Sequence, residues 1–143
     1  MQRGNSVSDR NDFNAQVIEE FRENGGKVGG PFADRPMLLL TTIGAKTGQP
    51  RTIPLVYTTD GDRIVIIASK GGAQTNPAWF HNIVANPDVT VEVGEENYEA
   101  RAIIPDRAER DRLFDAQAAI MPGFRDYQER TERIIPVVVL ERA

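Results

Sequence analysis

Residues 37–51 read MLLLTTIGAKTGQPR, an apolar run followed by a small polar turn with two glycines. A second stretch, residues 64–72, reads IVIIASKGG and repeats this arrangement. Glycine lets the backbone turn sharply and approach a ligand closely, and successive backbone N–H groups in such turns form concavities that hold anions. Lys46, Arg51 and Lys70 add cationic side chains that pair with phosphate or carboxylate groups. The pattern therefore predicts a site for an anionic small molecule.

The composition of the 143 residues, with 40% hydrophobic and 27% charged side chains, predicts one globular domain over residues 1–143. The net charge of −4 argues against sequence-independent nucleic-acid binding, which requires a basic surface. The absence of cysteine excludes disulfides and thiolate chemistry, and the single histidine excludes a metal site with two histidine ligands. Residues Met1–Arg10 lack a signal-peptide pattern, and the longest apolar run, Ile134–Leu140, is far shorter than the roughly 18 residues of a membrane span. We expect a cytoplasmic protein without a bound metal.

Hydrophobic periodicity and turn residues predict the secondary-structure elements. An amphipathic helix is expected over residues 12–23, with Phe13, Val17 and Phe21 spaced four apart, followed by a glycine-rich linker over 25–30 that ends at Pro31. Strands are expected over residues 37–42, 51–59, 63–69, 89–93, 98–104 and 134–141. Further helices are expected over residues 76–85, 106–120 and 124–131.

Local signals support the ends of these elements. Asp60-Gly61-Asp62 is a strong hairpin signal. Asn76 suits the N-cap of the second helix, with Pro77 at its first position. Asp106 and Glu109 have the spacing of a capping box.

Six antiparallel strands with inserted helices predict a mainly β, α+β fold. A small barrel is favoured because closing the sheet removes exposed edges, and an open α+β sheet is the alternative. Residues 1–30 would form the N-terminal helix and linker, and residues 31–143 the barrel. The mixed charge of the helix favours packing on the barrel or over the site, and disfavours contact with a membrane surface.

Each polar turn, taken alone, is typical of a simple connection between strands. Neighbouring antiparallel strands would bring both turns to one rim of the barrel, beside a helix start that favours anions. Walker and GxGxxG phosphate-binding patterns are absent. Ser69 has no evident base partner, and His81 is expected to be a solvated helix residue. If the protein is an enzyme, a bound cofactor is therefore expected to carry the chemistry.

The joint pattern resembles the deazaflavin-dependent nitroreductase family over nearly the whole chain from about Phe13. The matching segments keep their order and spacing; they are Leu38–Thr42, Gly44–Arg51, Pro54-Leu55, Asp60–Asp62, Ala68–Gly72, Asn76–Trp79, His81-Asn82, Ala85–Pro87, Tyr127 and Arg133–Val138. The resemblance implies a split β-barrel that binds coenzyme F-420, a deazaflavin with a phosphate and a glutamate-rich tail. It also implies reduction of small electrophilic compounds by hydride transfer.

The resemblance implies roles for individual residues as well. The phosphate region of the cofactor is expected at Lys46, Thr47, Gly48 and Arg51. The deazaflavin ring is expected beside Ala68, Ser69, Lys70 and Gly71. Walls for the ring or for the linker to the tail are expected from Pro77, Ala78 and Trp79, although aromatic residues at helical spacing are usually core residues. Lys27 is a candidate for the tail on the basis of its charge.

The acceptor is expected to stack on the exposed face of the ring, enclosed by Met121 and Phe124. Ser69 and Tyr127 are the candidate catalytic residues, because their hydroxyl groups would position the acceptor and stabilise negative charge on its oxygen. Nitro-reducing members have a tyrosine-rich patch where this chain has one tyrosine, and Val56 stands where a tyrosine can occur. With fewer hydroxyl donors, a quinone or an enone is at least as plausible an acceptor as a nitro compound.

Two alternatives stay open at this point. One is a split-barrel oxidase that handles FMN or pyridoxamine, with FMN as the cofactor. The other is a carrier that binds the deazaflavin without catalysis. The expected partner is a small electrophilic molecule, and the sequence leaves open whether the protein is a monomer or a homodimer.

Overall fold

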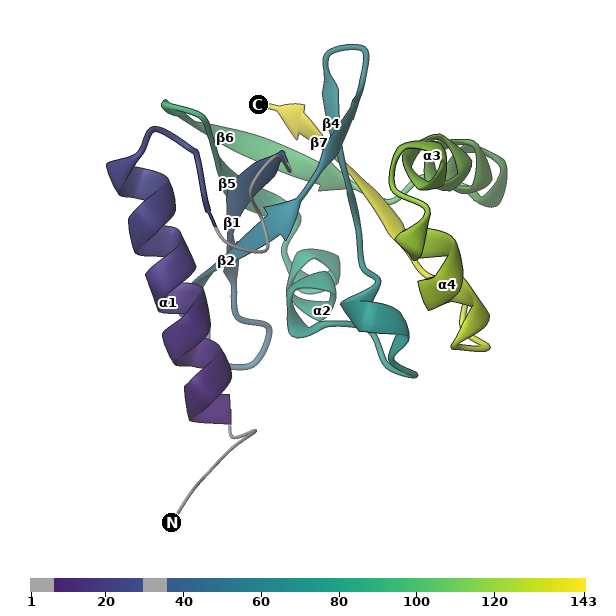
Figure 1. The fold of residues 1–143 in the computed structure, drawn as a ribbon, viewed down its shortest axis with the longest axis horizontal. Helices are drawn as coiled ribbons and strands as arrows, with labels where there is room; N and C mark the ends of the chain where they lie inside the picture. Colours follow the sequence, from purple (N-terminus) through teal and green to yellow (C-terminus); the bar gives the residue numbers. More distant parts are fainter. Residues whose placement is uncertain (1–6, 30–35) are drawn as a thin grey trace.

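The computed structural model describes residues 7–29 and 36–143; the predicted linker end, Gly30-Pro31, lies outside this range. The helices are α1 (Val7–Glu23), the 3-10 helix η2 (Lys70–Gly72), α2 (Ala78–Ala85), α3 (Arg107–Ile120) and α4 (Gly123–Glu129). The strands are β1 (Met37–Ile43), β2 (Pro50–Val56), β3 (Thr58–Asp60), β4 (Arg63–Ile67), β5 (Asp88–Val93), β6 (Glu96–Ile103) and β7 (Val137–Arg142). Figure 1 shows α1 on one side of the sheet, α3 and α4 on the other, and α2 below it.

The strands form one antiparallel sheet in the order β2-β1-β5-β6-β7-β4-β3. The sheet has seven strands, one more than the approximately six expected, because the expected strand 51–59 breaks at Tyr57. Its first part, β2, pairs with β1, and its second part, β3, pairs with β4.

This break requires the sheet to curl. β2 and β3 lie at opposite ends of the strand order, yet only Tyr57 separates them in sequence. In a flat sheet they would be about 29 Å apart, whereas two peptide steps span at most about 7 Å. The two edges therefore meet at Tyr57, and the expected barrel-like α+β fold is confirmed.

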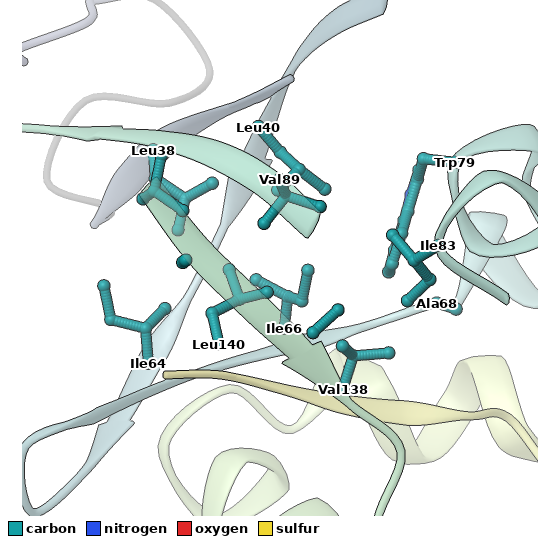
Figure 2. Close-up of a cluster of buried hydrophobic side chains, with 13 residues drawn as sticks. Leu38, Leu40, Ile64, Ile66, Ala68, Trp79, Ile83, Val89, Val138 and Leu140 are labelled. Carbon is teal, nitrogen blue, oxygen red and sulfur yellow. The ribbon is translucent and has the colours of Figure 1, made fainter. Parts of the chain in front are cut away.

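Strands β1, β4 and β7 have buried residues on both faces. Leu38 and Leu40 of β1 belong to the core inside the curled sheet, whereas Leu39 packs outside it with Val17 and Phe21 of α1. Alternate residues of β4 and β7 likewise point to opposite faces of the sheet. The inner core contains Ile64, Ile66, Val138 and Leu140, and the outer cluster beneath α3 contains Val65, Ile67, Val137 and Val139. Figure 2 shows the inner cluster, with side chains from facing strands pointing toward one another. Double burial explains why these strands have unbroken apolar runs.

The N-terminal helix therefore packs on the outer face of the sheet. Of the two expected positions, on the barrel or over the site, this is the first. Arg22 of α1 also donates hydrogen bonds to the Glu92 carboxylate of β5, at 3.0 and 2.7 Å. In the described residues, no helix is both long and apolar enough to cross a bilayer.

The helix ends differ in part from the prediction. Asp106 Oδ1 accepts the Glu109 N–H at 2.9 Å, as a capping box requires. The Glu109 carboxylate, however, accepts hydrogen bonds from Arg63 and Arg112 instead of from the backbone N–H of Asp106. Asn76 is not the N-cap of α2: Pro77 holds that position and offers no side-chain cap. The Asn76 side chain is bound to Arg133 instead.

Candidate active site

The two polar turns lie at the same rim of the sheet, although not for the expected reason. β1 and β4 are not neighbours, because β5, β6 and β7 lie between them. Four successive antiparallel pairings nevertheless leave β1 and β4 running in the same direction, so their C-terminal ends share a rim. Figure 1 shows α2 at this rim, between the β1–β2 turn and η2.

The β1–β2 turn, residues 44–49, is held by its own hydrogen bonds. Gly44 N donates to Gln49 O at 2.8 Å, Gly48 N donates to Gly44 O at 2.9 Å, and Gln49 N donates to Thr47 Oγ1 at 3.2 Å. Gly48 has φ +70°, which disfavours side chains. A Cβ on Gly44 would meet Thr47 Oγ1 at 2.6 Å, so a larger residue there would displace the Thr47 hydroxyl from its bond to Gln49.

The cations beside this turn are exposed and free of ion pairs. Every ion pair found within the described residues uses an arginine, and none includes Lys46, Lys70 or Arg51. Lys46 and Arg51 are both exposed. Their charges are therefore available to an anionic ligand.

The second turn, residues 68–76, includes a strained position. Lys70 has φ +49°, which is uncommon for a residue other than glycine. Its Nζ donates to Thr75 Oγ1 at 3.2 Å. Left-handed backbone of this kind costs of order 1 kcal/mol and is concentrated at functional sites.

Arg133 is hydrogen-bonded to this turn. From the sequence it was only part of the family motif, with no role of its own. Its guanidinium donates to Ala73 O at 2.8 Å, Ser69 O at 2.8 Å, Ala68 O at 3.2 Å and Asn76 Oδ1 at 2.8 Å. Burial lowers the pKa of Arg133, and no carboxylate in the described residues pairs with it. All four bonds go to neutral oxygens, so Arg133 fixes the conformation of the turn.

The second turn also packs against α4. A Cβ on Gly72, which has φ +83°, would meet Tyr127 O at 2.8 Å and Arg130 Cβ at 3.0 Å. Gln74 Nε2 donates to Arg130 O at 2.9 Å. The backbone of α4 is therefore in direct contact with the turn that follows β4.

A cavity of about 680 Å³ lies beside this contact. It is lined by Pro36, Tyr57, Thr58, Thr59, Ile120, Met121, Pro122, Gly123, Phe124 and Tyr127, none of which is charged. The structure thus brings the predicted residues Met121, Phe124 and Tyr127 together in one wall. The rings of Phe124 and Tyr127 pack edge to face with centroids 5.5 Å apart.

The opposite wall of this cavity was not predicted. Tyr57, Thr58 and Thr59 line it because the chain crosses between the sheet edges there, and reading 51–59 as one continuous strand hid this. Burial raises the pKa of the Tyr57 phenol, and the nearby Tyr98 adds to the shift. Tyr57 therefore remains a protonated donor at neutral pH.

Other predicted site residues lie elsewhere. Ala68 and Trp79 are in the inner core, with 0% and 7% of their surface exposed. Figure 2 shows Trp79 among the core side chains, so the core role is the one that the structure supports for it. Pro77 is buried and Ala78 exposed, and His81 is exposed, as expected for a solvated helix residue.

Comparison with known proteins identifies the family. The family model described as F420H(2)-dependent quinone reductase matches residues 14–142. The chain belongs to this family. An F420H(2)-dependent quinone reductase of Mycobacterium tuberculosis is 43% identical over 126 residues, which are 85% of each chain.

Solved structures agree with this assignment to the quinone reductase family. A structure described as an F420-H2 dependent reductase has a TM-score of 0.69 and 35% identity, covering 79% of this chain and 100% of its own. A domain-swapped dimer has a TM-score of 0.70 and 32% identity, covering 95% of this chain and 100% of its own. Membership of the quinone reductase family confirms the predicted resemblance, the reductase class and coenzyme F-420 as the family's cofactor, in preference to FMN.

The residues present fit the cofactor of this family. The phosphate and the carboxylate-rich tail are anionic, and Lys46, Arg51 and Lys70 make no ion pair with any residue that the structure describes and lie at two hydrogen-bonded turns. The uncharged cavity next to the second turn suits a neutral acceptor.

Proposed function

We propose that this chain reduces a small neutral quinone with the hydride of reduced coenzyme F-420. The observation that carries the proposal is the uncharged cavity, which adjoins the turn after β4 through Tyr127 and Gly72. Cations for the cofactor lie at the two turns, and an uncharged space for the acceptor adjoins the second turn.

The phosphate is assigned to Lys46, Thr47, Gly48 and Arg51. Lys46 and Arg51 supply charge. The Thr47 hydroxyl already accepts the Gln49 N–H, and a hydroxyl in this state still has its own proton to donate. Thr47 can therefore support the turn and donate to a phosphate oxygen at the same time.

The deazaflavin ring is assigned to the turn formed by Ser69, Lys70 and Gly71, with Pro77 and Ala78 beside it. When bound in its reduced form, the cofactor supplies a hydride to the acceptor. Arg133 donates hydrogen bonds to the carbonyl groups of Ala68 and Ser69, which stabilises one conformation of the turn before the ring binds. Holding donor and acceptor in contact supplies much of the rate acceleration.

The acceptor is assigned to the cavity, between Met121 and Phe124 on one side and Tyr57 on the other. A hydride and one proton from solvent convert a quinone to a hydroquinone. Ser69 or Tyr127 donates a hydrogen bond to the quinone oxygen as its negative charge develops. Nitro compounds and enones are secondary acceptors in this proposal.

Fluorescence titration with oxidised coenzyme F-420, with FMN in parallel, tests the cofactor assignment. We expect saturable binding of the deazaflavin only, and preference for FMN would refute the assignment. Binding without reduction of quinones, nitroaromatics or enones would indicate a carrier.

Lys46→Ala and Arg51→Ala test the phosphate site. Each is expected to weaken cofactor binding about tenfold, the order of one charge-assisted hydrogen bond. Gln49→Ala is the matched control, because it alters an exposed, uncharged side chain of the same turn. Unchanged affinity in both cation variants would remove the phosphate site from the proposal.

Ser69→Ala and Tyr127→Phe test the acceptor site. Each is expected to lower the turnover number more than cofactor affinity, because the lost hydroxyl acts on the acceptor. Equal turnover in both variants would exclude hydroxyl assistance. Light scattering would determine the oligomeric state, for which the domain-swapped structural relative supports a dimer.

A further inference from the structure

Asn82 of α2 has a buried side-chain amide in which both the oxygen and the nitrogen make a hydrogen bond. Only 8% of the surface of Asn82 is exposed. Asn82 Oδ1 accepts the backbone N–H of Ala45 at 2.9 Å, and Nδ2 donates to Thr42 Oγ1 at 3.0 Å. A buried amide without partners would cost free energy, so these two bonds fix the side chain in one orientation.

The Ala45 bond connects the β1–β2 turn to α2. The bonds within the turn set its shape but not its position relative to the helix. In the described part of the chain, Ala45 N to Asn82 Oδ1 is the one hydrogen bond that links residues 44–49 to α2. Ala45 directly precedes Lys46, so this bond determines where the Lys46 side chain starts.

The N-terminal end of α2 is fixed to the turn after β4. Arg133 donates to Asn76 Oδ1 just before the helix and to Ser69 O in the turn. Asn82 is four residues after Ala78, the first residue of α2, which is about 6 Å along the helix axis. α2 thus acts as a spacer that sets the separation between the two turns.

We infer that Asn82 is a positioning residue for the phosphate turn. It does not touch the cofactor; it holds Lys46 at the distance from Ser69 at which one molecule's phosphate and ring bind together. This inference rests on the proposed function, in which the two turns hold these two parts of one cofactor.

The test compares two ligands, coenzyme F-420 and the deazaflavin alcohol that lacks the phosphate and tail. Asn82→Ala is expected to weaken coenzyme F-420 binding about tenfold and to leave the affinity for the phosphate-free deazaflavin within twofold. A merely structural role would weaken both ligands equally.

Two further variants keep the test decisive. Thr42→Val removes only the Nδ2 bond and leaves the Ala45 anchor, so its affinity for coenzyme F-420 is expected to stay within threefold of the unsubstituted protein. Ala45→Pro removes the same anchor as Asn82→Ala from the exposed side of the turn and leaves the core intact. It is expected to reproduce the ligand-selective loss even where Asn82→Ala does not fold.

The outcomes separate the inference from the proposed function. Failure of the unsubstituted protein to bind coenzyme F-420 would overturn both. Normal binding by the unsubstituted protein, with equal losses for both ligands or with no loss in Asn82→Ala and Ala45→Pro, would overturn the positioning role alone.

Discussion

Gly72→Ala should be far more destabilising than a glycine replacement at an open turn. Gly72 has φ +83°, where an L side chain costs about 1–2 kcal/mol. The new Cβ would also meet Tyr127 O at 2.8 Å and Arg130 Cβ at 3.0 Å, and α4 must move to relieve this overlap. Overpacking of this kind adds about 1–3 kcal/mol, so we expect a total loss of about 2–5 kcal/mol in the free energy of unfolding.

Gly61→Ala is the matched control. Gly61 has φ +63°, but its Cβ would meet nothing within 4 Å, so only the backbone cost of about 1–2 kcal/mol applies. Urea unfolding of both variants measures the difference. Because Tyr127 and Phe124 line the cavity, displacement of α4 should also raise the KM for the acceptor in Gly72→Ala only. Equal loss of stability in the two variants would refute the contact between the turn and α4.

Three other predictions concern stability. Hydrogen bonds from Arg112 and Arg63 lower the pKa of Asp60 and of Glu109 to about 2, from 3.8 and 4.5. These carboxylates therefore stabilise the fold above about pH 4.5, and this stabilisation is lost as the pH falls toward 2. In urea unfolding at pH 6 and pH 3, Asp60→Asn should reduce the difference in stability between the two pH values. An unaltered difference would count against the ion pairs of Asp60 with Arg63 and Arg112. Gln117 is 0% exposed, and neither of its side-chain polar atoms has a hydrogen-bond partner among the described residues. Gln117→Met should therefore stabilise the protein by about 1–2 kcal/mol, whereas a loss of stability would indicate a bound water. Trp79→Ala should cost about 3–5 kcal/mol in thermal or urea unfolding, and a loss below 1 kcal/mol would contradict its core position.

Much of the local structure could be predicted because its determinants are close in sequence. The hairpin at Asp60-Gly61-Asp62 and the cap at Asp106 depend on residues within four positions of one another. The glycine-rich turns depend on backbone freedom that only glycine provides, as at Gly48. Such signals require no knowledge of the rest of the fold.

The long-range arrangement could not be predicted in the same way. The strand order and the break at Tyr57 depend on which edges meet when the sheet curls. Trp79 could be a core residue or a ligand wall until the position of α2 was known. Arg133 and Asn82 stood in the family motif, but their roles depend on partners 37 to 65 positions away.

The sequence by itself determined most of the strands, the cation-bearing turns and the family, since each is encoded in short runs of residues and in their order. Only the tertiary structure decided how the two turns are spaced and which residues form the uncharged cavity. The physical reason is that spacing and cavities arise from the curling of the sheet and the packing of α2 at its rim, which bring together residues far apart in the chain.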